Sequence, residues 1–195
     1  IVAYRAWLWK KIVGRDTAVM GALAKMTQDT ALACWCAPNE CHADVIAKAW
    51  QYLAHGQFEV IPPKFPTKTL SIKQPWAWLI IRPDIVDPVA RGRAYLGGDL
   101  KDIENRGWTT AHKGYFLIHA GRTVDKAGYD YVMQKHPTIP LPSIKELETG
   151  GIVGCARLVD VVERSGSRWK VDDQKGFVLM EQRPLPFFAC PGQLK

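Results

Sequence analysis

The sequence of 195 residues lacks any long, uninterrupted apolar run. A membrane-spanning helix needs about 20 predominantly apolar residues, and Arg5, Lys10 and Lys11 interrupt the apolar N-terminus before that length is reached. The same charges argue against the apolar core of a signal peptide. We therefore expect a soluble, cytoplasmic protein that has no membrane partner.

Cysteine is scarce and unevenly placed. The chain has 5 cysteines, and Cys34, Cys36 and Cys41 lie close together in the sequence. An odd number in this layout is not the framework of a secreted disulfide scaffold, so reduced thiols are expected. The sequence also lacks internal repeats and an initiating methionine. Because it begins at Ile1 inside a helical pattern, we expect that upstream sequence is missing.

The overall composition is that of a soluble globular protein. Hydrophobic residues make up 47% of the chain and charged residues 23%, which provides enough apolar material for a packed core. The formal net charge is +7, and almost all of this surplus lies beyond Val60. A surplus of this size attracts phosphate backbones but does not by itself identify a partner.

The first 56 residues show mainly helical patterns. Apolar spacing from Ile1 to Val13 predicts a helix, and Asp16 is expected to cap a second helix. The apolar run over residues 30–36 predicts a short buried strand. A third helix is expected from about Cys41 to Leu53, with Gly56 beyond its end. This part is therefore predicted to be a small helical segment that contains one strand.

A proline-rich stretch separates this segment from the rest of the chain. Residues 61–67 contain three prolines, which exclude both a helix interior and a central strand. The predicted organisation is therefore a helical segment over residues 1–60, a linker over residues 61–68 and a second domain over residues 69–195.

Strand patterns dominate the second domain, and helices are inserted between them. Asp87-Pro88 predicts the start of a helix that ends before Gly97-Gly98, and Thr123 is expected to cap a helix over residues 124–134. The expected strands cover residues 69–72, 113–120, 151–162 and 176–181. The predicted fold class is α+β, with a mixed β-barrel and inserted helices.

Three motifs in this domain resemble the ASCH domain. They are Leu70-Ser-Ile-Lys-Gln-Pro-Trp-Ala77, Lys101-Asp-Ile-Glu-Asn-Arg106 with Trp108, and Gly114-Tyr-Phe-Leu-Ile-His-Ala120. The resemblance implies a PUA-like barrel whose groove holds a nucleobase or nucleotide, in a family associated with RNA, transcription coactivation and, in some branches, hydrolysis. The chain departs from the family at Asp99, where a glycine is expected, so the loop that enters Lys101 is expected to differ.

The side chains in these motifs suit the binding of a flat, polar ring beside a phosphate. Aromatic rings can stack on a base, amides and carboxylates can bond to its edge, and cations can contact phosphate. The residues expected in these roles are Lys73, Gln74, Trp76, Lys101, Glu104, Asn105, Arg106, Trp108 and His119. The expected partner is RNA or a nucleotide, with single-stranded DNA as an alternative; the oligomeric state is left open.

A structural interpretation of the same residues stands beside the functional one. The tryptophans and His119 are also typical of a packed core, and Glu104 with Arg106 is also typical of an ion pair. If residues 101–106 are extended, Glu104 and Arg106 share one face and Lys101 lies on the other. A turn or bulge is then needed to bring Lys101 into the same pocket.

Catalysis is an alternative to binding alone. A branch of proteins similar to this domain removes acyl groups from modified cytidine with a lysine, a threonine three positions later and a distant glutamate. Here Glu104 occupies the threonine position, so the hydroxyl nucleophile is replaced by a carboxylate. Glu104 could then act only as a general base on water, while Lys101 stabilises the oxyanion. RNA cleavage would pair Glu104 with His119 or Lys101. A third hypothesis is a protein-interaction module of a larger assembly.

The string Cys34-Trp-Cys-Ala-Pro-Asn-Glu-Cys-His42 resembles the end of DUF4326, an uncharacterised domain family often found in bacteria and phages. The resemblance covers roughly the first 55 residues. The residues Cys34, Cys36, Cys41 and His42 could form a zinc site, because zinc accepts three thiolates and one imidazole. A reactive thiol at Cys41 and buried, inert cysteines are the alternatives. Apart from zinc, no cofactor is expected.

Overall fold

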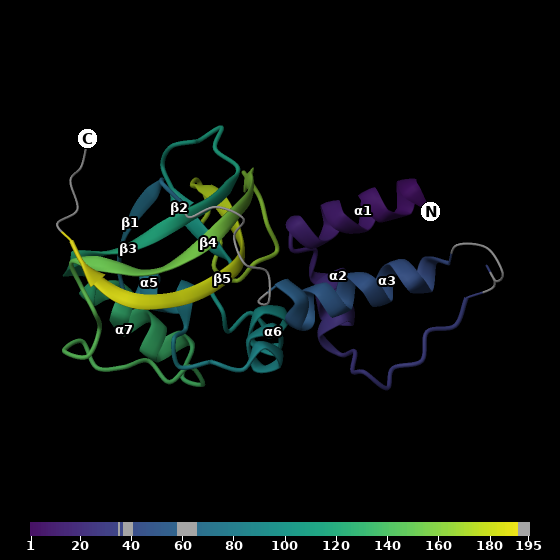
Figure 1. Cartoon of the computed structure of the whole chain (residues 1–195), viewed down its shortest axis with the longest axis horizontal. Coiled ribbons are helices and arrows are strands. Elements are labelled where there is room, and N and C mark those ends of the chain that lie inside the picture. Colours follow the sequence, from purple (N-terminus) through teal and green to yellow (C-terminus); the bar gives the residue numbers. More distant parts are fainter. Residues whose placement is uncertain (35, 37–40, 58–65, 191–195) are drawn as a thin grey trace.

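The computed structural model describes residues 1–34, 36, 41–57 and 66–190, and its architecture is α+β (Figure 1). These residues contain six α-helices, one π-helical turn and a five-stranded mixed sheet. The N-terminal helices lie to one side of the sheet (Figure 1). Within the described ranges, no helix combines the length and the apolar character that a membrane span requires.

The N-terminal part is helical, as expected. Its elements are α1 (Val2–Val13), α2 (Thr17–Ala24), α3 (His42–Gln51) and the π-helical turn η1 (Tyr52–Gly56). The Asp16 carboxylate accepts a hydrogen bond of 3.1 Å from the Val19 N–H, so it caps α2 as predicted. Helix α3 begins directly after Cys41, whose thiol accepts a hydrogen bond from the Ala43 N–H.

The strand expected over residues 30–36 is wrong. Residues 30–34 form neither helix nor strand, and Thr30 to Ala33 are exposed; Trp35 lies outside the described residues. All the described strands fall between Thr69 and Ala189, and none of them pairs with this segment. The apolar run therefore has no partner strand, and its backbone faces solvent.

The second part of the chain forms the sheet. Its strands are β1 (Thr69–Gln74), β2 (Ile103–Arg106), β3 (Gly114–Val124), β4 (Gly151–Val162) and β5 (Lys175–Ala189). Their order is β1-β3-β4-β5-β2; β1 is parallel to β3, and the other neighbours are antiparallel. The four strands that the sequence predicts in this part of the chain are present as β1, β3, β4 and β5, and β5 extends well beyond its predicted end.

The sheet is not closed into a barrel, which corrects the expectation of a mixed β-barrel. Strands β1 and β2 form its two edges, and no ladder joins them among the described residues. Strand β2 ends at Arg106, whose guanidinium donates a hydrogen bond of 2.8 Å to the Ser71 carbonyl of β1. A side chain rather than a backbone ladder therefore connects the two edges.

Three helices accompany the sheet. They are α5 (Trp76–Ile81), α6 (Pro88–Gly97) and α7 (Lys126–Lys135). Helix α6 begins and ends as predicted, because Asp87 caps its N-terminus and Gly98, at φ 82°, ends it. The expected cap of α7 at Thr123 is wrong: β3 continues to Val124, and Asp125 accepts the capping hydrogen bond from the Gly128 N–H.

The N-terminal helices share an apolar core with residues of the sheet region. Side chains such as Leu8, Ile12 and Leu53 cluster with Tyr95 of α6 and Met180 of β5. The predicted linker lies between these two parts, and its residues 61–65 fall outside the described ranges. The two parts are therefore packed against each other through an apolar contact.

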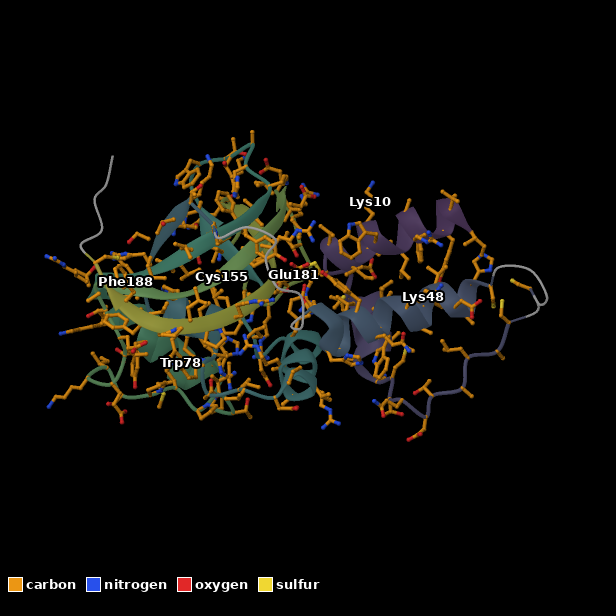
Figure 2. The ribbon with its side chains drawn as sticks, viewed as in Figure 1. Lys10, Lys48, Trp78, Cys155, Glu181 and Phe188 are labelled. Carbon is orange, nitrogen blue, oxygen red and sulfur yellow. The ribbon has the colours of Figure 1, made fainter. Side chains whose placement is uncertain are left out.

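Two polar contacts cross the same junction. Arg15 forms an ion pair with Asp102, and both side chains are almost fully buried. Glu181, which lies where the sheet meets the helices (Figure 2), accepts a hydrogen bond of 2.5 Å from the Tyr52 hydroxyl. Glu181 also pairs with Arg157 at 3.0 Å. These contacts fix the helices on the sheet.

Candidate functional site

Charged and aromatic side chains line a cleft of about 310 Å³ in the sheet region. Its walls come from the start of α5, the segment that enters β2, helix α7 and the connection between β4 and β5. The cleft includes four residues that the sequence assigns to one pocket: Trp76, Lys101, Glu104 and Asn105.

Lys101 and Glu104 form an ion pair in this cleft. The Lys101 Nζ lies 2.7 Å from the Glu104 Oε2 and also donates to the Ile103 carbonyl. Arg106 contacts the other carboxylate oxygen of Glu104 at 3.1 Å. Lys101 is 2% exposed and Glu104 7%, so two cations neutralise a carboxylate that is almost removed from water.

The chain reaches this geometry because Lys101 and Asp102 precede β2, which begins at Ile103. Lys101 lies between a bend at Leu100 and the first residue of the strand, so the strict alternation of a strand does not apply to it, and its ammonium contacts Glu104 three residues later. Lys101 thus reaches the shared pocket because it lies outside the strand, and the structure has a bend at Leu100 in place of the turn or bulge that the sequence suggested.

Trp76 forms an aromatic wall of the cleft. Its indole N–H donates a hydrogen bond of 2.9 Å to the Asp125 carboxylate, and the Lys101 Nζ lies 5.9 Å from the centre of its ring. Hydrogen bonds from the Gly128 N–H and the Trp76 indole hold the pKa of Asp125 below its usual range. Asp125 thus caps α7 and orients Trp76 at the same time.

The connection between β4 and β5 forms the opposite wall, which the sequence analysis did not identify. Asn105 fixes it: its amide donates to the Trp169 carbonyl at 2.7 Å and accepts from the Val171 N–H at 2.9 Å. Arg168 and Lys170 flank Trp169 on this wall and add two cations to the lining. The alternation of basic and aromatic residues in Arg168-Trp-Lys170 is the signal that could have indicated this wall.

Tyr131 was also missed by the sequence analysis. It lies on α7, lines the cleft and is 47% exposed. This exposure leaves its ring surface open to a ligand. Its ring contacts His136, which in turn packs on Trp169. The cleft therefore has aromatic side chains on both α5 and α7.

The described lining of the cleft does not include the other sequence-predicted residues. The Gln74 amide is buried and bonds to the Glu148 carbonyl and the Trp78 N–H. Trp108 is 50% exposed and packs edge-on against Phe177. Lys73 is exposed on β1, and its charge contributes to the lowered pKa of Asp125. Arg106 reaches the site only through Glu104.

His119 is held in the core of the sheet. Its Nδ1 lies 3.0 Å from the Ser71 hydroxyl and its Nε2 lies 3.1 Å from the Cys190 carbonyl. A carbonyl accepts only, so Nε2 carries a proton and Nδ1 accepts from Ser71 in the neutral ring. Both nitrogens are thus engaged by partners outside the cleft.

A second group of reactive side chains lies at the start of α3. The Sγ atoms of Cys34, Cys36 and Cys41 all lie within 4.8 Å of one another, and the His42 Nδ1 lies 3.3 Å from the Cys36 Sγ. Hydrogen bonds with Cys36 and Cys41 lower the pKa of Cys34 to about 6, and the bond with Cys34 raises the pKa of Cys36. The four residues that the sequence proposes for zinc are therefore close together.

The cleft and the thiol group offer different chemistry. The cleft combines aromatic surface, one carboxylate in ion pairs and several cations, which suits a planar ligand that carries negative charge. The thiol group offers soft sulfur ligands together with an imidazole.

Comparison with known proteins identifies the N-terminal part alone. A family model described as Domain of unknown function (DUF4326) matches residues 1–52, so this segment is a DUF4326 domain. No curated protein matches the chain. The family assignment thus covers the thiol group and α1 to α3, and it leaves the cleft unassigned.

Proposed function

We propose that the sheet region is an ASCH-like module that binds a nucleobase of RNA, or a nucleotide, in the cleft beside Lys101. The observation that carries this proposal is the convergence of Trp76, Lys101, Glu104 and Asn105 on one cleft. They come from two motifs about 25 residues apart in the sequence. The resemblance of both motifs to the ASCH domain supports the same function.

The bound base would contact both aromatic and polar groups. Trp76 and Tyr131 offer ring surfaces for stacking, which is favourable for any base. The Lys101 ammonium has three N–H donors, and two of them are used by Glu104 and the Ile103 carbonyl. The third can donate to a base carbonyl, and Glu104 retains lone pairs that can accept from a base amino group.

The phosphate would lie toward the wall formed by Arg168 and Lys170. Arg168 is placed by an ion pair of 2.7 Å with Asp99, the residue that departs from the ASCH pattern. Lys170 is held by the carbonyls of Val171 and Gln174. Two cations fixed at the cleft wall favour a ligand with phosphate on this side of the ring.

The experiment that tests this function measures the binding of a fluorescently labelled single-stranded RNA at several salt concentrations, with nucleotides as competitors. We expect affinity that falls as salt rises, because phosphate contacts release counterions. Trp76→Phe should weaken binding, while Trp108→Phe, at an exposed tryptophan outside the cleft, should leave it unchanged. Absence of binding to RNA and nucleotides, or an equal effect of both substitutions, contradicts the proposal.

Hydrolysis is the second candidate, and the 2.7 Å contact between Lys101 and Glu104 inside the cleft favours it. In this reaction Glu104 would take a proton from water as the water oxygen adds to the acyl carbon of an acylated cytidine, and Lys101 would stabilise the oxyanion. The C–N bond would then break, and Glu104 would return the proton to the amine of the released cytidine. Proton uptake by Glu104 would weaken its contacts with Lys101 and Arg106. Release of free acid from acylated cytidine by the protein, and its loss in Glu104→Gln, would support hydrolysis over binding alone.

RNA cleavage by Glu104 and His119 has less support. The two ring nitrogens of His119 bond to Ser71 and Cys190, and the residue does not contribute to the described lining of the cleft. The labelled RNA of the binding experiment also tests this reaction, because cleavage would shorten the labelled strand.

A further inference from the structure

We propose that Cys34, Cys36, Cys41 and His42 bind one zinc ion that holds the segment after α2 against the start of α3. The three thiols and the imidazole belong to the DUF4326 domain and are separate from the cleft. This site goes beyond the proposed nucleotide-binding function, because neither its ligands nor its chemistry involve a nucleotide.

The distances between the ligand atoms fit a tetrahedral site. Zinc lies about 2.3 Å from sulfur and about 2.0 Å from imidazole nitrogen, so ligand atoms in a tetrahedron are roughly 3.5–3.8 Å apart. Here the three sulfur atoms lie within 4.8 Å of one another, and the Cys36 Sγ lies 3.3 Å from the His42 Nδ1. The Cys34 and Cys36 sulfurs, at 2.9 Å, need to separate by less than an ångström or so to accommodate the ion.

The surroundings favour thiolates, the form of cysteine that binds metal. Cys41 is the N-cap of α3, a helix of ten residues, and its Sγ accepts a hydrogen bond of 3.3 Å from the Ala43 N–H. The positive end of the helix dipole therefore stabilises negative charge at the cluster. Three sulfurs and one imidazole select zinc over magnesium or calcium, which prefer oxygen ligands.

The ring of His42 is already oriented for this role. Tyr4 of α1 packs edge-on against the imidazole, with ring centres 4.7 Å apart. The Nδ1 atom faces Cys36, and the contact with Tyr4 fixes the ring plane. A metal at this place would therefore connect the segment before α3 to both α3 and α1.

The site would be structural rather than catalytic. Four protein ligands complete a tetrahedral zinc site and leave no position for a reactive water. Residues 27–33 between α2 and the cluster are exposed and form no helix or strand, so apolar burial contributes little to their placement. Figure 1 places the start of α3 at the end of the helical part that lies away from the sheet. A metal crosslink there would supply the stabilisation that the core does not.

The first experiment measures zinc bound to the full chain after purification in a reducing buffer free of strong chelators. We expect close to one zinc per chain in the unmodified protein. The variants Cys34→Ser, Cys36→Ser, Cys41→Ser and His42→Ala should each lose most of it. The matched controls Cys190→Ser and His55→Ala, at a partly exposed thiol and imidazole outside the cluster, should retain it.

Cobalt substitution keeps the test valid if a variant fails to fold. When Co²⁺ is added to the zinc-free, unmodified protein, we expect the visible absorption of tetrahedral cobalt and the ultraviolet band of thiolate coordination, with saturation at one equivalent. Zinc should then displace the cobalt. Octahedral cobalt without the thiolate band, or no zinc in the unmodified protein even after zinc is added, would overturn the proposal.

Thiol alkylation separates a zinc site from a disulfide between Cys34 and Cys36. In the zinc-loaded protein, the three cluster thiols should be protected while Cys190 reacts, and a strong chelator should add three reactive thiols. Cys155 is buried in the sheet (Figure 2) and should react in neither state. Zinc binding would be contradicted if the chelator leaves the set of alkylated cysteines unchanged. It would also be contradicted if two of the cluster thiols become reactive only after a reductant is added.

Discussion

The cleft and the thiol cluster hold their functional side chains in opposite ways. Lys101 and Glu104 are almost buried, and each has partners that the fold itself provides. Cys34, Cys36 and Cys41 are partly exposed and contact mainly one another and His42. The packed core keeps the geometry of the cleft when no ligand is bound. The thiol cluster lies at the exposed end of the helices and needs a bound ligand to keep its geometry. Four substitutions test the first half of this comparison, that the packed fold holds the cleft in place.

The largest effect is expected at the junction that couples the two regions. Arg15→Met removes the partner of Asp102 from an ion pair that is almost fully buried. Asp102 directly follows Lys101 of the cleft in the sequence. Leaving a buried charge uncompensated costs about 3–5 kcal/mol. Urea unfolding should show this lower free energy of unfolding in a single transition that the N-terminal helices and the sheet share. The control Lys11→Met breaks a partly exposed pair with Asp16 and should cost about 1 kcal/mol or less. Equal costs for the two substitutions would show that the junction does not stabilise the fold.

The next effect concerns the close approach of α6 and η1. A Cβ added at Gly92 would lie 1.3 Å from the Ala54 carbonyl oxygen, so Gly92→Ala must push the helices apart. Overpacking of this kind costs about 1–3 kcal/mol. Gly97→Ala is the matched control on the same helix, because its Cβ would meet nothing within 4 Å. If thermal unfolding gives the same midpoint for both variants, the two elements do not pack as described.

Tyr131 tests whether the aromatic wall of the cleft contacts a base. Tyr131→Ala should weaken RNA or nucleotide binding by about 1–3 kcal/mol, the usual contribution of one stacked base. Folding should be little affected, because the side chain is 47% exposed. Met133→Ala, on the same helix and 50% exposed outside the described lining, is the control for titrations monitored by fluorescence anisotropy. Identical affinities of the two variants would exclude stacking on Tyr131.

The smallest effect is expected at Asp125, and it depends on pH. Asp125→Asn can still cap α7 but has one acceptor oxygen for two donors, the Gly128 N–H and the Trp76 indole, which should cost about 1 kcal/mol at pH 7. Because the folded pKa of Asp125 is lowered, its contribution is complete above the unfolded pKa and is lost as pH falls through the folded value. The difference in unfolding free energy between the two proteins should therefore shrink toward pH 3. A difference that stays constant or grows on acidification would contradict the lowered pKa.

Local signals in the sequence predicted most of the fold. The caps at Asp16 and Asp87 and the end of α6 at Gly97 and Gly98 follow from residues that are neighbours in the sequence, and the structure confirms them. The cap of α7 was misplaced because Thr123 and Asp125 are both suitable capping residues, and only the length of β3 decides between them. The strand over residues 30–36 failed because an apolar run needs a partner strand that no local pattern reveals.

The site was predictable where the motif residues are close in the sequence and not where the fold joins distant segments. Lys101, Glu104 and Asn105 lie within five residues, at the point where the chain enters β2, and this short separation brings them to one cleft. Trp169, in the connection between β4 and β5, and Tyr131, on α7, reach the same cleft from segments that no motif covers. Gln74 carries a suitable side chain, but the carbonyl of the distant Glu148 and the N–H of Trp78 occupy the two ends of its amide.

The most direct test of the cleft compares Lys101→Met with Lys113→Met in binding to the labelled RNA, with circular dichroism to confirm that both variants are folded. Lys101 contacts Glu104 inside the cleft, and Lys113 forms an exposed pair with Asp160 on the sheet. Removal of a hydrogen bond from a charged donor costs about 1.5–3 kcal/mol, so Lys101→Met should weaken binding by roughly tenfold or more. Lys113→Met should change it little. Equal affinities of the folded Lys101→Met variant and the unmodified protein would contradict a ligand site beside Lys101.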